Sequence, residues 1–515
     1  MTWTPSVTFE DTNAASLPND QDIEKTLAQG VVSNSGLSMY QAMKRPDFGQ
    51  RVPYAQARLS RRVQALRPHL HARAIEVSDP SLDRSDETAV AINPRHPHNI
   101  VAGAASFDGT QFTNTAYVTK DGGRTWKTVV ALANTSEGAG IAFDDSNNCY
   151  YTTMRGGFFP VCVVSKDGGL TWSQPAAFGF GDKTAVAARG QTALCGFDRI
   201  NIEACAFTLD GGATWTVHDF TDRGIGTAPL ISYDQQHFYI IYAALDQNLK
   251  MYASSDQGQT WAGPMTIVAG NASQSAIVGP LSYEGGALTS PGTNVAIDGR
   301  GRLHVLYIDS AKQLPMYTTS HDHGATWSAP EDVNPKRAGD AHMWPCLSCT
   351  RHGDLQAGSL VFDQALGKYS ILQHLKGEDD DEWTTREVDN GPWAVGGPSP
   401  SFRIGFGDYF DCDSLPQCGT TVMAWSETPN GQQPWQTWVH LSDACECRED
   451  RLDALEDEIE RLTEAFDNHE LPFPRTEETV EKFQSKLSEL RDRRAAAQTT
   501  LERCREANPS PEDSQ

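Results

Sequence analysis

The chain has 515 residues, of which 39% are hydrophobic, so it is long enough to bury a large core. Its formal net charge of −25 at pH 7 argues against nucleic acid or an anionic membrane as the main partner, because either needs a basic surface. No apolar run reaches the length of a membrane-spanning helix, and residues 1–5 lack the basic and apolar regions of a signal peptide. We therefore expect a soluble protein without membrane insertion, in a compartment that stays unknown.

Residues 1–70 are expected to form a partly helical N-terminal extension. The stretches 22–28 and 37–44 are typical of short helices, and 54–70 is an arginine-rich helical candidate interrupted by Pro68. The dense basic cluster in this stretch either packs against the acidic body of the protein or serves as a partner-binding arm. Its members are Arg58, Arg61, Arg62 and Arg67.

An eight-residue pattern, [S/T]-x-D-x-G-x-T-W, begins at Thr119 and occurs five times; it is called the repeat motif below. Its aspartates are Asp121, Asp167, Asp210, Asp256 and Asp322. The aspartate accepts backbone hydrogen bonds, the glycine allows a positive φ, and the flanking residues favour strands, so each copy predicts a tight hairpin turn. Successive aspartates are 46, 43, 46 and 66 residues apart, which is the period of a four-stranded propeller blade with an insertion expected in 266–290. The tryptophan five residues after each aspartate is expected to pack between neighbouring blades.

The repeat motif resembles the Asp-box, or BNR repeat, of the sialidase-like β-propellers, and the resemblance covers roughly residues 88–443. It implies an all-β propeller in which the motifs lie on the periphery, away from the catalytic face. The motif therefore predicts architecture, and function must be argued from other residues.

The propeller is expected to span 71–443, with seven blades favoured and six as the alternative. Strand patterns near 359–388 predict a blade that lacks the repeat motif, whereas six blades would follow if 335–400 formed loops. The last blade offers only three strand patterns. A spare strand near 72–78 is therefore predicted to complete it and close the ring.

From Cys445 the pattern changes to that of a helical hairpin or coiled coil over 444–507, followed by a disordered tail over 508–515. Apolar residues step by three and four between Leu452 and Phe466 and again from Val480 to Leu501. The hairpin is either an intramolecular brace or a handle for a protein partner or self-association. Both remain open.

The placement of the eleven cysteines suits disulfides in an oxidising environment, which export by a non-classical route would provide. The alternative is a location inside a cell, where the thiols stay reduced. The predicted disulfides pair Cys195 with Cys205, Cys412 with Cys418, and Cys445 or Cys447 with Cys504. A disulfide is also the favoured use of Cys346 and Cys349, with a zinc site that includes His342 and His352 as the alternative. No cofactor is expected. The acidic run 378–382 is either a solvated loop or a weak calcium site.

The resemblance implies three arginines that grip a substrate carboxylate, a tyrosine nucleophile and an aspartate acid/base over the central channel. The Arg-Ile-Pro sequence of that family is absent ahead of the first repeat motif. The candidate site residues are Asp108 as proton shuttle, Tyr409 as nucleophile, and Arg155, Arg223 and Arg403 as carboxylate ligands.

Two functions follow from these observations. The favoured one is a binding module that takes a glycan, glycoprotein or protein on its channel face, without nucleic acid. The alternative is an exo-sialidase-type, retaining glycoside hydrolase that acts on terminal sialic acids or related acidic sugars. The missing Arg-Ile-Pro sequence and the appended helices favour binding.

Overall fold

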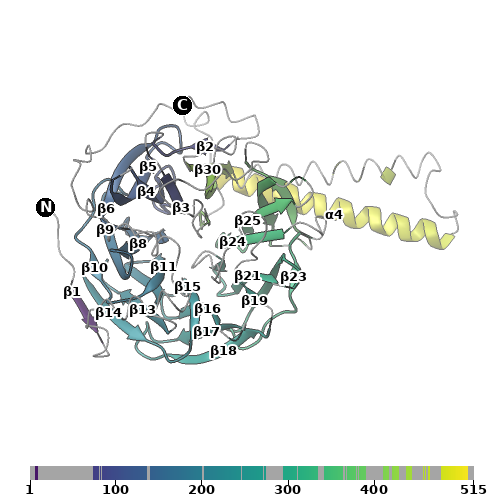
Figure 1. Cartoon of the computed structure of the whole chain (residues 1–515). Helices are drawn as coiled ribbons and strands as arrows, with labels where there is room; N and C mark the ends of the chain where they lie inside the picture. The colour runs from purple at the N-terminus through teal and green to yellow at the C-terminus, as the bar shows by residue number, and fades with distance from the viewer. Residues whose placement is uncertain are drawn as a thin grey trace. The chain divides into compact units, whose positions relative to one another are not determined.

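The computed structural model is a ring of seven blades, each built on four antiparallel strands (Figure 1). The structure describes residues 6–9, 74–79, 82, 84–108, 110–135, 140–199, 202–244, 246, 248–270, 272–273, 294–309, 311–334, 341–363, 366, 368–378, 380, 382–389, 410–416, 420–427, 436–443, 456, 459, 462–463 and 477–507. The seven-bladed prediction is confirmed, and the six-bladed alternative is wrong because the chain after the fifth repeat motif forms a complete blade.

The first four blades run in chain order from the innermost strand outwards. Their strands are β3 (Arg84–Ile92), β4 (Ile100–Phe107), β5 (Phe112–Thr119) and β6 (Lys127–Ala133); β7 (Gly140–Phe143), β8 (Cys149–Arg155), β9 (Phe159–Ser165) and β10 (Ala176–Ala177); β11 (Asp182–Arg189), β12 (Thr192–Asp198), β13 (Glu203–Thr208) and β14 (Thr214–Asp219); and β15 (Gly224–Ile231), β16 (Phe238–Ala244), β17 (Leu249–Ser254) and β18 (Ala262–Val268).

Blades five and six follow the same plan. Their strands are β20 (Val295–Ile297), β21 (Leu303–Asp309), β22 (Leu314–Ser320) and β23 (Glu331–Asp332), with β19 (Ala272–Ser273) also paired to β21; and β24 (Ala341–Cys349), β25 (Leu355–Asp363), β26 (Lys368–Lys376) and β27 (Thr384–Glu387). The inserted residues predicted in 266–290 do fall between the fourth and fifth blades, since β18 ends at Val268 and β20 begins at Val295.

The seventh blade joins the two ends of the propeller sequence, as predicted. It contains β28 (Asp411–Ser414), β29 (Thr420–Glu427), β30 (Gln436–Asp443) and, as outermost strand, β2 (Ile75–Glu76). Ile75 pairs with Val439 and Glu76 with Trp438 in an antiparallel register. A short strand that the sequence did not predict, β1 (Ser6–Phe9), lies parallel to β14 on the edge of the third blade. The predicted N-terminal helices lie outside the described residues.

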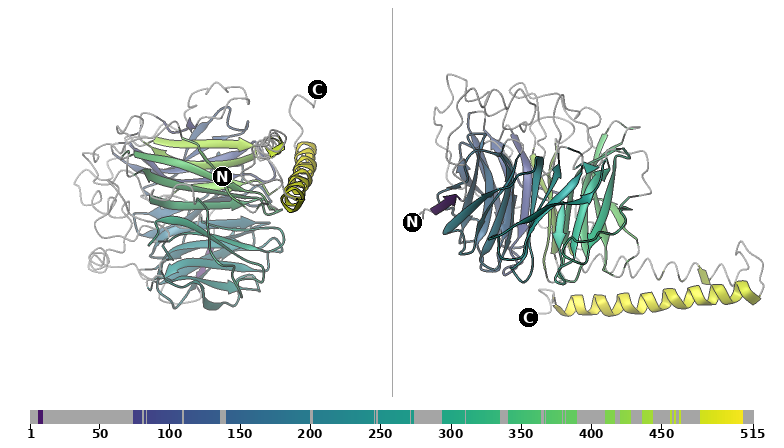
Figure 2. Two further views of the ribbon diagram at one scale, coloured as in Figure 1. Left: turned by 90° about the vertical axis from the view of Figure 1, so that its right-hand side faces the viewer. Right: turned by 90° about the horizontal axis from the view of Figure 1, so that it is seen from below.

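The innermost strands β3, β7, β11, β15, β20, β24 and β28 contact one another in turn around the axis. Figure 2 shows the strands running from one end of the ring to the other. We call the end at which the innermost strands begin the start face, and the end at which they finish the end face. Since the strands of a blade alternate in direction, all five repeat motifs, which join third to fourth strands, lie on the end face.

Each repeat motif forms the hairpin turn that its residues predict. In the first copy Asp121 accepts hydrogen bonds from Thr119 Oγ1 (2.8 Å), Thr125 N (2.8 Å) and Thr125 Oγ1 (2.6 Å), and Gly123 has a φ of +88°. The other four copies repeat these three hydrogen bonds and the positive φ. Three hydrogen bonds to the carboxylate keep the turn closed, and the charge of that carboxylate is not buried.

The motif tryptophans pack between neighbouring blades, as predicted. Trp215 is buried against Tyr150 and Phe178 of the second blade, with ring centres 6.3 and 5.1 Å away. Trp126 lies in the apolar cluster that joins the first and seventh blades. The tryptophans therefore tie each blade to the preceding one.

The disulfide predictions that fall on described residues are wrong. None of the seven described cysteines forms a disulfide. Cys195 pairs in register with Ala206 and Cys205 with Gly196, so the two side chains point to opposite faces of the same sheet. Cys346 and Cys349 likewise point to opposite faces of β24, which excludes both their disulfide and a zinc site that uses both thiols. The predicted pairing of Cys412 with Cys418 is wrong too, because Cys412 forms no disulfide. The pairing with Cys504 remains a prediction.

Residues 417–421 and 442–515 form a second compact unit, which contains helix α4 (Glu477–Ala507). A helix predicted over the residues from Val480 to Leu501 is thus confirmed, whereas the hairpin stays a prediction. Most of the predicted first helix lies outside the described residues, and Glu456 accepts a hydrogen bond from Arg494 Nε of α4 at 2.7 Å. Within the described part of the chain, no helix combines the length and apolar character needed to cross a bilayer.

Candidate functional site

The described members of the predicted catalytic set lie on the start face of different blades. Asp108 follows β4, and its Oδ1 accepts hydrogen bonds from Thr110 N (2.9 Å), Thr110 Oγ1 (2.8 Å) and Gln111 N (2.8 Å), which is the role of a turn residue. Arg155 ends β8 and Arg223 precedes β15, and both side chains are exposed.

No hydrogen bond or ion pair among the described residues joins these three side chains. Arg403 and Tyr409 lie outside the described residues. The predicted five-residue site therefore stays a prediction.

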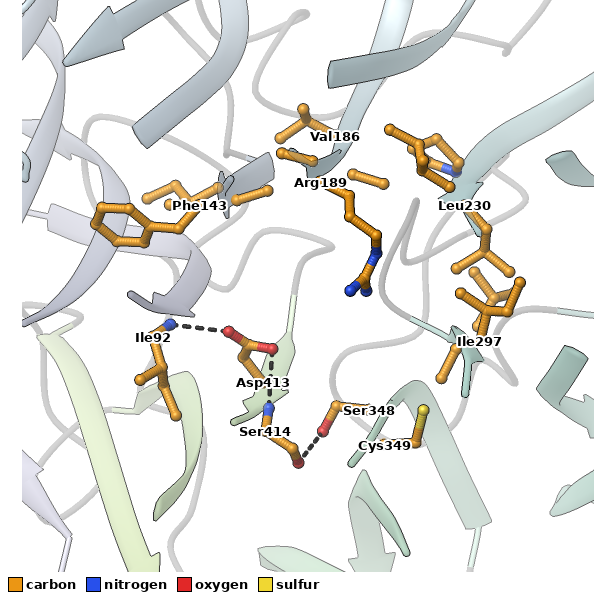
Figure 3. A pocket seen from close by; sticks show the side chains of 18 of the residues that line it. Ile92, Phe143, Val186, Arg189, Leu230, Ile297, Ser348, Cys349, Asp413 and Ser414 are labelled. Carbon is orange, nitrogen blue, oxygen red and sulfur yellow. Dashed lines mark hydrogen bonds between the residues drawn. The ribbon is translucent and has the colours of Figure 1, made fainter. Parts of the chain in front are cut away.

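The propeller contains a cavity of about 190 Å³ on its axis, lined by all seven innermost strands (Figure 3). It lies toward the end face, because its lining includes the last residue of each of these strands. These are Ile92, Phe143, Arg189, Ile231, Ile297, Cys349 and Ser414. Apolar side chains form much of the wall, namely Ile92, Phe143, Val186 and Leu230. Polar groups nevertheless supply most of the accessible surface of the cavity, whereas small-molecule sites are usually mostly apolar.

Two aspartates of the last blade hold the ring closed beside this cavity. Asp411 accepts a hydrogen bond from Val90 N, and Asp413 accepts one from Ile92 N, both at 2.8 Å. Burial raises the pKa of Asp413 to about 6, although the N–H groups of Ile92 and Ser414 stabilise its ionised form. Burial raises the pKa of Asp411 well above its ordinary value. Ser414 Oγ also lies 2.8 Å from Ser348 Oγ of the sixth blade.

Arg189 is the cation of the cavity, and it points across the channel toward Asp413 in Figure 3. Its guanidinium carbon lies 3.5 Å from the centre of the Tyr233 ring, a close cation–π contact. The guanidinium carbon of Arg351 lies 5.4 Å from the same ring centre. Burial raises the pKa of Tyr233, while the charge of Arg189 opposes that rise. Two cations of different blades thus meet at one aromatic ring.

Neither Arg189 nor Arg351 has a carboxylate within 4.0 Å among the described residues. Arg189 Nε is buried and makes no hydrogen bond there. A buried donor without an acceptor costs free energy that a bound acceptor would recover.

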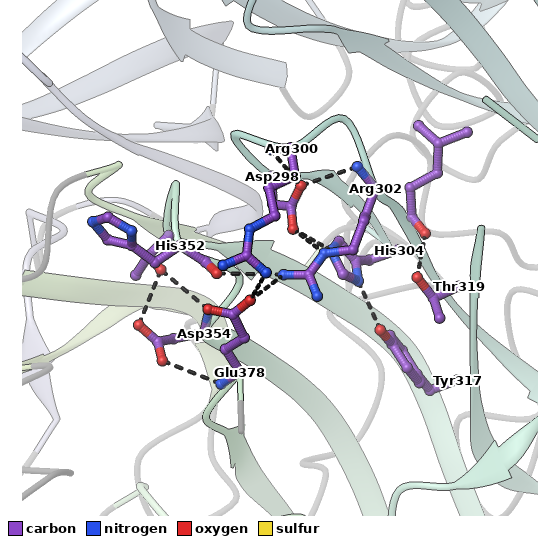
Figure 4. A network of polar contacts seen from close by, with 11 residues as sticks. Asp298, Arg300, Arg302, His304, Tyr317, Thr319, His352, Asp354 and Glu378 are labelled. Atoms are coloured by element: carbon purple, nitrogen blue, oxygen red, sulfur yellow. Dashed lines mark hydrogen bonds and ion pairs between the residues drawn. The ribbon is translucent and has the colours of Figure 1, made fainter. Parts of the chain in front are cut away.

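Two other arginines near the end face, Arg300 and Arg302, are paired, as Figure 4 shows for the seam between blades five and six. Arg302 forms ion pairs with Asp298 and Glu378, and Arg300 forms one with Glu378. Burial raises the pKa of Asp298, but hydrogen bonds from His304 and Arg302 outweigh it and lower that pKa. This network is fully explained as a brace between blades.

Three buried carboxyl groups form a row near the start face of the third blade. The strand register places Asp182 beside Asp198 and Asp198 beside Glu203, with side chains 6%, 1% and 0% exposed. Burial raises the pKa of Glu203 to about 8 and that of Asp198 well above its ordinary value. Thr227 Oγ1 donates to Glu203 Oε2 at 3.1 Å. In the described part of the chain, no group of three or more His, Cys, Asp or Glu side chains is arranged to hold a metal ion.

The sequence analysis missed Arg189, Tyr233 and Asp413. Each lies at or just beyond the end of an innermost strand, in a segment with no distinctive motif. Aligning the first five blades on their repeat motifs would have placed Arg189 and Tyr233 near the channel, but the last blade, which contains Asp413, lacks the motif. The convergence of Arg189 and Arg351 on one ring depends on contacts between non-neighbouring blades and left no local signal.

The sequence matches no protein-family model and no curated protein. Solved structures with a similar fold include YCF48 from Cyanidioschyzon merolae, with 13% identity and a TM-score of 0.39 over 72% of this chain and 98% of that one. A leech intramolecular trans-sialidase has 10% identity and a TM-score of 0.38 over 72% of this chain and 69% of that one. The Aleuria aurantia lectin bound to α-methyl-L-fucoside has 10% identity and a TM-score of 0.38 over 62% and 98%. Likeness at this level carries no argument about function.

Proposed function

We propose that this chain is a binding propeller whose ligand is a glycan, with one sugar residue held in the axial cavity. The cavity itself carries the proposal, because every blade contributes its innermost strand to the wall. Its volume of about 190 Å³ is below the roughly 300 Å³ at which pockets for drug-sized ligands begin, so it suits a single small residue.

The polar groups of the cavity match the needs of a sugar. Ser348 and Ser414 supply hydroxyl groups, Asp413 supplies a carboxyl group, and Arg189 supplies donors. Tyr233 offers an aromatic ring at the same site. Hydrogen-bonding groups fix the orientation of a sugar, and apolar walls shield those hydrogen bonds from water.

The test is a glycan array followed by calorimetric titration of the glycans that bind. Ala142 lines the cavity and is half-buried, so Ala142→Leu is expected to reduce the affinity at least tenfold by occupying the space. Ala262→Leu makes the same change on an exposed position of β18 and serves as the matched control. Equal affinity of the Ala142→Leu variant and the control would refute binding in the cavity.

A retaining glycoside hydrolase of sialidase type is the second candidate. It is supported by the position of Asp108, Arg155 and Arg223 on loops of one face, the start face. A fluorogenic sialoside distinguishes the two functions. Turnover that Asp108→Asn abolishes would favour hydrolysis over binding alone.

A further inference from the structure

The inference concerns the chemistry of the ligand at the end-face mouth of the channel, and it rests on the proposed function of the cavity. Arg189 of the third blade and Arg351 of the sixth blade both place their guanidinium groups near the Tyr233 ring. Two positive charges near one ring repel each other, and an anion near both would offset that repulsion.

The protein is rich in acidic residues, yet no described carboxylate lies within 4.0 Å of either cation. The chain carries 67 Asp and Glu against 42 Lys and Arg, and Arg199, Arg300 and Arg302 all form ion pairs with carboxylates. Arg189 and Arg351 form none within the described residues, and Arg189 Nε has no acceptor. One carboxyl group of the cavity, that of Asp413, accepts the N–H groups of Ile92 and Ser414 and is influenced by the charge of Arg189 without a direct ion pair.

We infer that the end-face mouth of the channel binds an oxyanion of its ligand, with Arg189 as the main anchor, Arg351 as a second cation and Tyr233 as the ring that orients them. A guanidinium presents parallel N–H donors that match two oxygens of a carboxylate, sulfate or phosphate. The cation–π contact holds the guanidinium of Arg189 in one position, which lowers the entropic cost of binding. The ligand is therefore an acidic sugar, and a carboxylated one is the form we propose.

The experiment compares D-glucuronic acid with D-glucose by calorimetry on the full chain, because the two sugars differ by the carboxylate. Sodium sulfate and inorganic phosphate are titrated separately, to distinguish a carboxylate site from a general oxyanion site. The inference predicts that glucuronic acid binds at least tenfold more tightly than glucose.

Arg189→Gln is expected to remove this preference, and Arg189→Lys is expected to restore only part of it, because an ammonium keeps the charge without the paired donors. Arg351→Gln is expected to weaken the preference less. Arg124→Gln is the matched control, since Arg124 is exposed in the first repeat motif. Circular dichroism and thermal unfolding verify that each variant is folded.

The outcomes separate this inference from the proposed function. In one outcome the two sugars bind with equal affinity and Ala142→Leu abolishes the binding of both. That result would support the binding function of the cavity and overturn the oxyanion site. A preference that survives Arg189→Gln would also overturn it. If sulfate or phosphate binds more tightly than glucuronic acid, the site recognises another oxyanion. That result would overturn the assignment of a carboxylated sugar.

Discussion

The guanidinium carbon of Arg189 lies 3.5 Å from the centre of the Tyr233 ring, on the axis of a seven-bladed ring and without a carboxylate partner in the described part of the chain. This contact joins the end of β11, the innermost strand of the third blade, to the turn that follows β15, the innermost strand of the fourth blade. It places a positive charge against the wall of a cavity that Asp145, Asp411 and Asp413 also line, and Asp413 accepts backbone N–H groups. The following predictions test the consequences of this arrangement and of the fold that produces it.

Tyr233→Leu is expected to weaken binding of glucuronic acid by roughly two- to thirtyfold, because cation–π contacts contribute about 0.5–2 kcal/mol. Tyr233→Phe keeps the ring and is expected to retain most of the affinity. Calorimetry of the two variants measures the difference. Equal losses in both would mean that the hydroxyl group, and not the ring, matters.

Affinity for an acidic sugar is expected to fall as the pH rises through about 6. The pKa of Asp413 is raised from 3.8 to about 6, so its carboxyl group is neutral below that pH and negatively charged above it, where it competes with the ligand for Arg189. We expect a decrease of roughly three- to tenfold between pH 5 and pH 8.

The control for this pH dependence is Asp413→Asn, in which the affinity should be constant over the same range. The other groups in or near the cavity are the same in the wild type and in this variant, so a difference between the two pH profiles comes from Asp413. These groups are Asp145, Asp411, Cys349, Tyr233 and Arg351. The same pH profile in both proteins would assign it to one of those groups.

Glu203 is expected to make the protein less stable at alkaline pH. Its pKa is raised from 4.5 to about 8, so the folded state binds its proton more tightly than the unfolded state does. The stability it contributes is present in full below pH 4.5 and is lost as the pH rises to about 8, by at most roughly 1.4 kcal/mol per pH unit.

Glu203→Gln keeps an acceptor for Thr227 without a charge, so its free energy of unfolding should decline less over this range. Glu382→Gln, at an exposed position, is the control. Denaturant unfolding at several pH values provides the measurement. Parallel curves for the wild type and Glu203→Gln would show that Glu203 is already ionised in the folded protein.

Trp215→Ala is expected to destabilise the propeller by about 3–5 kcal/mol, because it leaves a cavity between the second and third blades. Trp327→Ala should cost less, since Trp327 is only half-buried in the fifth repeat motif. Chemical denaturation of the two variants measures the difference. A larger loss for Trp327→Ala would contradict the account of the blade seams.

Much of the fold was predictable because its signals are local. The repeat motif contains its own turn chemistry, and the spacing of Asp121, Asp167 and the later copies set the blade period. Closure of the ring by β2 followed from counting strands in the last blade. Strand register is not local, so the one-residue offset that separates Cys195 from Cys205 was missed. The grouping of Arg189, Tyr233 and Arg351 arises only when the ring closes, so the sequence analysis placed the site on the other face.

The most direct test of the proposed function is calorimetric titration of glucuronic acid into the wild type, Ala142→Leu and Ala262→Leu. The account predicts binding by the wild type and Ala262→Leu, with affinity at least tenfold lower in Ala142→Leu. Equal affinity in all three proteins would place the ligand outside the axial cavity and contradict the account.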